Sequence, residues 1–289
     1  YWRDWSSDVC SSDLPLGHHG FVDSAANGPW GTALVEEFIP ALERNFRLIP
    51  RAEARLLTGH SSGGWSSLWL MLTNPDFFGG CWSSSPDPVD FTAFQQSDLY
   101  GDANMWVDAA GDERASFRRP VGPMEKVLMT VREEMGMERA IDPSGGSGQQ
   151  WDAWCAMFGA PDARGRPRPL CDATSGAIDH ALVREAWSSY DIARLIERRW
   201  KRLEPVLRDK VRLLVGDRDS FYLERAVKRL KSKVQALRSA TAEPGAAPPA
   251  GDGFIEVLPD ATHDTAAAIA RGRFALDMRA HLKRHGLGD

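Results

Sequence analysis

Apolar residues are spaced along the chain in two ways, which together predict strands alternating with helices. Short apolar runs typical of strands in a buried parallel sheet occur at residues 54–58, 77–84, 211–215 and 254–258. Apolar residues three and four positions apart predict amphipathic helices over residues 31–46, 65–72, 223–237 and 266–283. Pro40 is expected to bend the first of these helices. The alternation indicates an α/β fold with a mostly parallel sheet flanked by helices.

The texture of the chain changes between residues 101 and 204, where Gly/Ser-rich and Arg/Pro-rich stretches interrupt the alternation. One helix is expected there over residues 123–137, because Pro123 suits the first turn of a helix. We interpret this region as a cap inserted into the core. The predicted organisation is a first core part at residues 15–100, the cap at 101–204 and a second core part at 205–289. The tryptophans of the cap either line an acyl or sugar pocket or pack in the core.

The first fourteen residues do not fit this organisation. Residues 4–14, DWSSDVCSSDL, are identical to the translation of a sequencing adapter. We therefore expect residues 1–14 to be a foreign tail and exclude them from the fold prediction. On this interpretation the native sequence starts in mid-gene near Pro15, so that upstream strands and any signal peptide are missing. A genuine Ser/Asp-rich terminus is the alternative.

Composition argues against several classes of function. The 289 residues carry a formal net charge of -5, and the arginines are scattered, which argues against a nucleic-acid partner. No apolar run has the length of a membrane span. The cysteines follow no metal-ligand spacing, and we expect no metal or organic cofactor; they are Cys10, Cys81, Cys155 and Cys171. Cys155 and Cys171 are either a disulfide of an oxidising compartment or buried free thiols. The oligomeric state and the compartment, cytoplasmic or secreted, stay open.

The candidate chemistry begins where the first predicted strand ends. Residues 59–63 read Gly-His-Ser-Ser-Gly, a Gly-x-Ser-x-Gly pattern between a strand and a helix. Such a sharp turn exposes Ser61, whose hydroxyl becomes a nucleophile only when a base reaches it. The backbone N–H of Ser62 is expected to point at the oxyanion that forms on the substrate. Gly59 and Gly63 leave room for the tight backbone.

The partners that a serine nucleophile needs follow in chain order. His263 lies in the loop after the last predicted strand and is the candidate base, and Asp219 lies in the acidic turn after residues 211–215. Asp219 is the preferred carboxylate, with Asp217 and Glu224 as alternatives. Serine, acid and histidine, each at the carboxyl end of a strand, are the order found in α/β-hydrolases.

Four segments resemble the esterase branch of the α/β-hydrolase superfamily, which includes S-formylglutathione hydrolases (esterase D), feruloyl esterases and enterochelin esterases. The segments are GHHGFVDSAANGPWG, LLTGHSSGGWSSLWL, DFFGGCWSSSPDPVDF and GDRDSFYLE. The resemblance implies an α/β-hydrolase fold with Ser61 as nucleophile, Asp219 as acid and His263 as base. It also implies a second oxyanion N–H at or just before residues 15–19, a donor that the expected truncation would remove.

From this resemblance we expect a serine carboxylester hydrolase that passes through an acyl-serine intermediate and acts on a small ester or thioester. Candidate substrate contacts are His18, His19, His60 and Trp65. Metal binding by the adjacent His18 and His19 would need further ligands that their neighbourhood does not offer. Acyl transfer, C–C bond or peptide hydrolysis on the same triad, and a non-catalytic binding protein on this fold are the alternatives.

Overall fold

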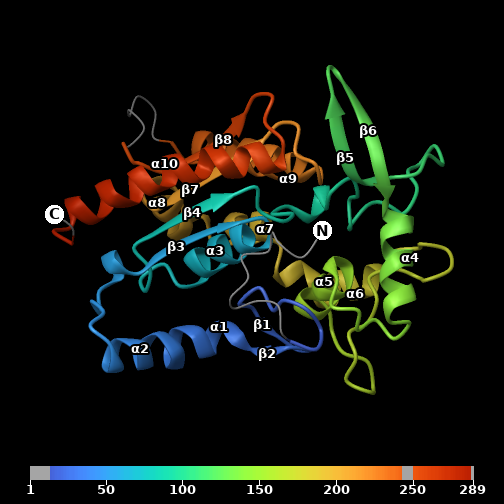
Figure 1. Cartoon of the computed structure of the whole chain (residues 1–289), viewed down its shortest axis with the longest axis horizontal. Coiled ribbons are helices and arrows are strands. Elements are labelled where there is room, and N and C mark those ends of the chain that lie inside the picture. The colour runs from blue at the N-terminus through green and yellow to red at the C-terminus, as the bar shows by residue number, and fades with distance from the viewer. Residues whose placement is uncertain (1–13, 243–249, 288–289) are drawn as a thin grey trace.

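The computed structural model describes residues 14–242 and 250–287. The predicted foreign tail, apart from Leu14, and its Cys10 lie outside the described residues. At the centre of the molecule is a parallel sheet with helices on both faces (Figure 1). In spatial order its strands are β3 (Leu56–His60), β4 (Gly80–Ser84), β7 (Val211–Gly216) and β8 (Phe254–Leu258). The predicted α/β-hydrolase type of fold, with a mostly parallel sheet flanked by helices, is confirmed.

The two faces of the sheet are covered by different helices. One face packs on α3 (Ser62–Thr73), α8 (Trp200–Asp209) and α9 (Leu223–Thr241). The other face packs on the long α10 (His263–Arg284). Successive residues of a strand point to opposite faces, so Leu213 and Val215 of β7 join the first core, and Leu214 joins Phe274 of α10 in the second.

The register of the strands brings four loops to one edge of the sheet. His60 pairs with Ser84 at the ends of β3 and β4, and Gly216 pairs with Leu258 at the ends of β7 and β8. Because parallel strands share one direction, the residues that follow them lie close together at the carboxyl end. The loops that begin at residues 61, 85, 217 and 259 therefore converge, and the first two are joined by a hydrogen bond from Asp87 N to Ser61 O of 3.3 Å.

The helix predicted over residues 123–137 is wrong in its first half. The structure has an antiparallel hairpin of β5 (Ala115–Val121) and β6 (Met124–Thr130), followed by α4 (Val131–Ile141). The hairpin turns at Gly122, whose φ of 56° suits glycine, and Pro123 belongs to that turn instead of a first helical turn. The helix starts only where Thr130 forms a capping box with Glu133. The hairpin projects from the body of the molecule (Figure 1).

The helix expected over residues 31–46 is present, and its type changes just before Pro40. It consists of α1 (Trp30–Thr32), a π-helical turn at Ala33–Phe38 and α2 (Ile39–Asn45). Pro40 sits in the first turn of α2, where its missing N–H costs nothing, and the wider π turn lies before it. The structure thus places a change of helix type where the bend was expected. Ahead of it, β1 (Asp23–Ser24) and β2 (Gly28–Pro29) form a short antiparallel pair.

The region predicted as a cap packs onto the core through aromatic side chains. Its helices after α4 are α5 (Gln150–Phe158), α6 (His180–Glu185) and α7 (Ile192–Arg198), and it has a short 3-10 turn at Trp187–Ser189. Two further 3-10 turns, at Ala52–Ala54 and Phe91–Ala93, lie in the first core part. Trp187 and Phe158 contact each other at 5.4 Å between ring centroids, and Phe158 contacts Trp65 of α3 at 5.0 Å. The boundary predicted between residues 204 and 205 falls inside α8, which packs on β7.

Cys81, Cys155 and Cys171 are buried free thiols. For Cys155 and Cys171 the structure therefore favours free thiols over a disulfide. Burial raises the pKa of all three thiols, which keeps them protonated and unreactive at neutral pH. Among the helices of residues 14–242 and 250–287, none combines the length and apolarity that crossing a bilayer requires.

Candidate active site

Ser61 stands at the tip of a sharp turn between β3 and α3. Its φ of 55° and ψ of -126° lie outside the regions that non-glycine residues ordinarily occupy. The turn needs glycine at position 59, since a Cβ there would lie 2.1 Å from Gly63 O. This conformation is that of a nucleophile elbow, in which the serine side chain is pushed out of the backbone toward solvent or substrate.

Ser62 is the first residue of α3, so its backbone N–H has no acceptor within the helix. First-turn N–H groups also carry the positive end of the helix dipole. The backbone N–H of Ser62 can therefore donate a hydrogen bond to a negative charge that develops beside Ser61. The side chain of Ser62 is engaged elsewhere, because its Oγ donates to Asp87 Oδ2 at 2.7 Å.

Asp219 and His263 form a buried pair at the same edge of the sheet. His263 Nδ1 and Asp219 Oδ2 are 2.8 Å apart, and the side chain of Asp219 is fully buried. Asp219 Oδ1 also accepts the backbone N–H of Phe221 at 2.9 Å, which fixes the carboxylate. His263 begins α10 after the N-cap Thr262, so it lies on a helix instead of in the predicted loop.

The two alternative carboxylates do not contact His263. The backbone N–H of Asp217 donates to Leu258 O at 2.9 Å. Its side-chain Oδ1 is buried and has no hydrogen-bond partner in the described part of the chain. Glu224 instead pairs with Arg118 of the hairpin at 2.8 Å. Of the three candidates, the structure brings only Asp219 to the histidine.

The pair shifts both pKa values in the direction that charge separation requires. Burial alone would raise the pKa of Asp219, but the attraction and hydrogen bond of His263 outweigh it and hold that pKa below its usual range. Burial opposes protonation of His263, yet Asp219, with help from Asp264 and Asp87, raises its pKa. Asp219 therefore stays ionised and supports a proton on His263 Nδ1.

A second histidine, His60, stands against the first. Its ring centroid is 4.3 Å from that of His263, and its Nδ1 lies 3.2 Å from Ser84 Oγ. Burial, and then repulsion by His263, lowers the pKa of His60 to about 3, so it is neutral at every physiological pH. It can act as a wall of the site and as a hydrogen-bonding group, but it does not titrate with the base.

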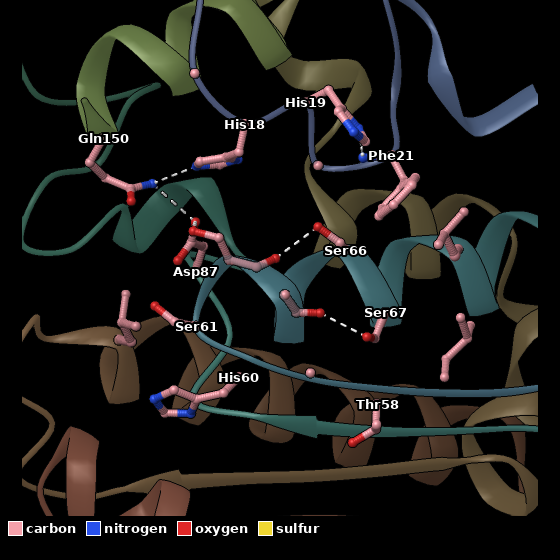
Figure 2. Close-up of a pocket in the computed structure, with 18 of the residues that line it drawn as sticks. His18, His19, Phe21, Thr58, His60, Ser61, Ser66, Ser67, Asp87 and Gln150 are labelled. Atoms are coloured by element: carbon pink, nitrogen blue, oxygen red, sulfur yellow. Dashed lines mark hydrogen bonds between the residues drawn. The ribbon is translucent and has the colours of Figure 1, made fainter. Parts of the chain in front are cut away.

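A cavity of about 1940 Å³ opens in front of these residues. Ser61, Ser62, His60 and His263 line one side of it, and Phe117 with Phe221, stacked at 5.0 Å, line another part. Figure 2 shows Ser61 between Asp87 and His60, with His18 and Gln150 beyond Asp87. No group of three or more His, Cys, Asp or Glu side chains within the described ranges is arranged to hold a metal ion.

The structure corrects the expectation that Trp65 contacts substrate. Trp65 is fully buried, is absent from the cavity wall, and stacks on Trp69 at 5.4 Å in the core. The reason is its place in α3, four residues after Ser61, where its side chain faces the core that the cap helices complete. His18 and His19 do line the cavity, although His19 is packed flat against Trp30 at 4.5 Å and accepts the N–H of Phe21.

Sequence reasoning missed a polar network on the other side of Ser61. Asp87, Gln150 and Trp154 line the cavity and are joined by hydrogen bonds. The signal was available, because Asp87 follows β4 and the carboxyl ends of neighbouring parallel strands meet. Gln150 and Trp154, by contrast, come from α5, which no strand order places at this edge.

Comparisons with known proteins give the family of the chain. A model of the family described as "Putative esterase" matches residues 7–243. The match starts inside the segment predicted to be foreign, and that interpretation stays a prediction. No curated protein matches the sequence.

Solved structures that resemble the chain include three hydrolases, each 14% identical to it. The first is a ferulic acid esterase, with a TM-score of 0.42 over 89% of this chain and 62% of that chain. The second is an S-formylglutathione hydrolase from Agrobacterium tumefaciens, with a TM-score of 0.40 over 90% of this chain and 62% of that chain. The third is a fluorophosphonate-binding serine hydrolase from Staphylococcus aureus, with a TM-score of 0.41 over 88% of this chain and 66% of that chain. The chain thus spans less than two thirds of the length of these proteins.

Proposed function

The chain belongs to this esterase family, and on that premise we propose that it is a serine hydrolase that cleaves a small carboxylic ester or thioester through an acyl-Ser61 intermediate. The observation that supports the proposal is the buried Asp219–His263 pair, whose histidine lines the same cavity as Ser61. In this proposal Ser61 is the nucleophile, His263 at the start of α10 is the base, and Asp219 is the carboxylate that orients it.

In the first half of the reaction, Ser61 Oγ attacks the ester carbonyl while His263 Nε2 takes its proton. Asp219 holds the other ring proton on Nδ1, which keeps Nε2 free to accept and supports the imidazolium that forms. The Ser62 N–H stabilises the oxyanion of the tetrahedral intermediate. The intermediate collapses, the alcohol or thiol leaves with the proton from His263, and the acyl group stays on Ser61.

The second half repeats these steps with water. His263 removes a proton from the water that attacks the acyl carbonyl, a second oxyanion forms beside Ser62, and Ser61 leaves with the proton that His263 returns. The products are a carboxylic acid and the free enzyme.

Covalent labelling tests this proposal. A fluorophosphonate reacts only with an activated serine, because its phosphorus mimics the attacked carbonyl and fluoride leaves. We expect the peptide that contains Ser61 to gain the phosphonyl mass, and heat-denatured protein to gain none. Labelling absent from Ser61 in folded protein would overturn the proposal.

The pH dependence of kcat/KM is a second expected result. Below its pKa, His263 carries a proton on both nitrogens and cannot accept one from Ser61, so activity appears only as the pH rises through that pKa. Since the environment raises the pKa of His263 above the ordinary 6.5, we expect the acidic limb to have an apparent pKa above that value. A pH-stat assay with a neutral ester measures it, and an acidic limb well below 6.5 would contradict the assignment.

A further inference from the structure

A carboxylate that the proposed mechanism does not use, Asp87, lies beside the nucleophile. Its backbone N–H donates to Ser61 O at 3.3 Å, and its side chain accepts the hydroxyl of Ser62 at 2.7 Å. Asp87 lines the cavity although it is only 4% exposed. The carboxylate therefore faces the space where a substrate would bind, close to the N–H on which an oxyanion would form.

The hydrogen bonds of Asp87 occupy only one of its two oxygens. Oδ2 accepts Ser62 Oγ, Gln150 Nε2 at 3.3 Å and Trp154 Nε1 at 2.8 Å. Oδ1 accepts no hydrogen bond from any residue that the structure describes. An ionised carboxylate offers about four lone-pair sites, two on each oxygen, and both oxygens can accept hydrogen bonds. Oδ1 is the part of Asp87 left for a ligand.

No lysine or arginine among the described residues balances the charge of Asp87. The three donors are a hydroxyl, an amide and an indole N–H, all of them neutral. Within the described residues no lysine or arginine forms an ion pair with it, whereas the neighbouring buried carboxylate, Asp90, has Lys233 Nζ at 3.8 Å. Buried charges in proteins are ordinarily paired with an opposite charge. The absence of a lysine or arginine beside Asp87 in the described part of the chain therefore suggests that a bound ligand supplies the positive charge.

The histidine next to this network does not supply the positive charge. Gln150 Nε2 lies 3.3 Å from His18 Nε2 and, being a donor, makes that nitrogen the acceptor. The single ring proton then sits on Nδ1, which is buried without a partner among the described residues. Burial lowers the pKa of His18 despite the attraction of Asp87. The amide of Gln150 thus holds a neutral histidine on one side and the carboxylate on the other.

The charge of Asp87 favours a proton on His263 but opposes the oxyanion of the proposed reaction. When the substrate carbonyl becomes an oxyanion at the Ser62 N–H, a second negative charge on Asp87 lies a few Å away and repels it. A positive group on the substrate that contacts Asp87 removes this repulsion and gains an ion pair with a carboxylate that is only 4% exposed.

We propose that Asp87, through Oδ1, binds an ammonium group of the substrate, so that the enzyme selects esters that carry a positive charge near the scissile bond. The inference rests on the proposed function and names the substrate class of the same site. An ammonium fits because it has only donors, and the free oxygen is an acceptor.

Two pairs of isosteric esters test the proposal, one for each side of the scissile bond. For the acyl side, 4-nitrophenyl 6-aminohexanoate is compared with 4-nitrophenyl heptanoate, and for the alcohol side 4-aminobutyl acetate is compared with pentyl acetate. We expect kcat/KM for the cationic member of at least one pair to exceed that of its neutral partner by at least about tenfold. In Asp87→Asn this ratio falls to about one, because the shape is kept and the charge is lost.

Asp90→Asn is the matched control, since Asp90 is a buried carboxylate three residues away that does not line the cavity. It should retain the cationic preference. Ratios near one in the wild type, or a preference that Asp87→Asn retains, would overturn the proposal. The proposal is also overturned if kcat/KM for 4-nitrophenyl 6-hydroxyhexanoate exceeds that for the heptanoate by as much as kcat/KM for the amine does, because recognition of a hydroxyl needs no charge.

Fluorophosphonate labelling separates this outcome from failure of the proposed function. If Ser61 is labelled and neutral esters are hydrolysed without any cationic preference, only the role of Asp87 is wrong. If Ser61 is not labelled, the hydrolase proposal fails and the substrate class falls with it. Labelling of Ser61 in Asp87→Asn shows that the elbow still assembles in the variant.

Discussion

Replacing Ser61 with alanine is expected to lower kcat for ester hydrolysis by about a millionfold and to abolish fluorophosphonate labelling. The substitution removes only the attacking oxygen, and the base and the Ser62 N–H stay in place but have no nucleophile to serve. Alanine tolerates the strained φ of 55° about as well as serine, so the midpoint of thermal unfolding should change little. Steady-state hydrolysis, with a melting curve of the same samples, measures both effects.

The tandem serine supplies the control for this variant. Ser62→Ala loses the hydrogen bond to Asp87 but keeps the backbone N–H at the start of α3, so we expect a loss of no more than about a hundredfold in kcat and persistent labelling of Ser61. If Ser61→Ala keeps the activity of the wild type, or if Ser62→Ala loses more activity than Ser61→Ala, the nucleophile is another residue.

The central sheet was predictable from the sequence because its strands are short, largely apolar runs, of which β4 and β7 are buried throughout. The run FIEVL is β8 residue for residue, and VRLLV lacks only the final Gly216 of β7. Such runs contain little polar surface and leave no other favourable structure. The hairpin at residues 115–130 was not predicted, because its exposed strands show no apolar alternation, and their pairing depends on a turn at Gly122 that only the folded chain reveals.

The candidate site divides in the same way. Ser61, Asp219 and His263 each follow a predicted strand, and parallel strands bring their ends together whatever the details of the loops. Trp65 was placed in the cavity only because it is near Ser61 in sequence, but helix geometry turns it into the core. The Gln150 contact to Asp87 joins residues 63 positions apart, and no local pattern carries that information.

Replacing Asp219 with asparagine is expected to lower kcat by about ten thousandfold while leaving the fold intact. The asparagine amide can donate a hydrogen bond to His263 Nδ1, which the carboxylate cannot do. The ring proton then moves to Nε2, the nitrogen that must accept from Ser61, and the imidazolium of the transition state loses its counter-charge. The acidic limb of the pH profile should also move to lower pH, because the group that raises the pKa of His263 is gone.

Asp217→Asn is the matched variant that makes this prediction specific, since Asp217 follows the same strand yet does not contact His263. Its carboxylate has one buried oxygen without a partner, so the neutral amide should be tolerated and kcat should stay within about threefold of the wild type. Equal losses in the two variants would mean that the acidic turn acts through its overall charge and not through one oriented hydrogen bond. A loss confined to Asp217→Asn would reassign the acid, and the pairing of His263 with Asp219 at 2.8 Å would then be a resting contact instead of the catalytic one.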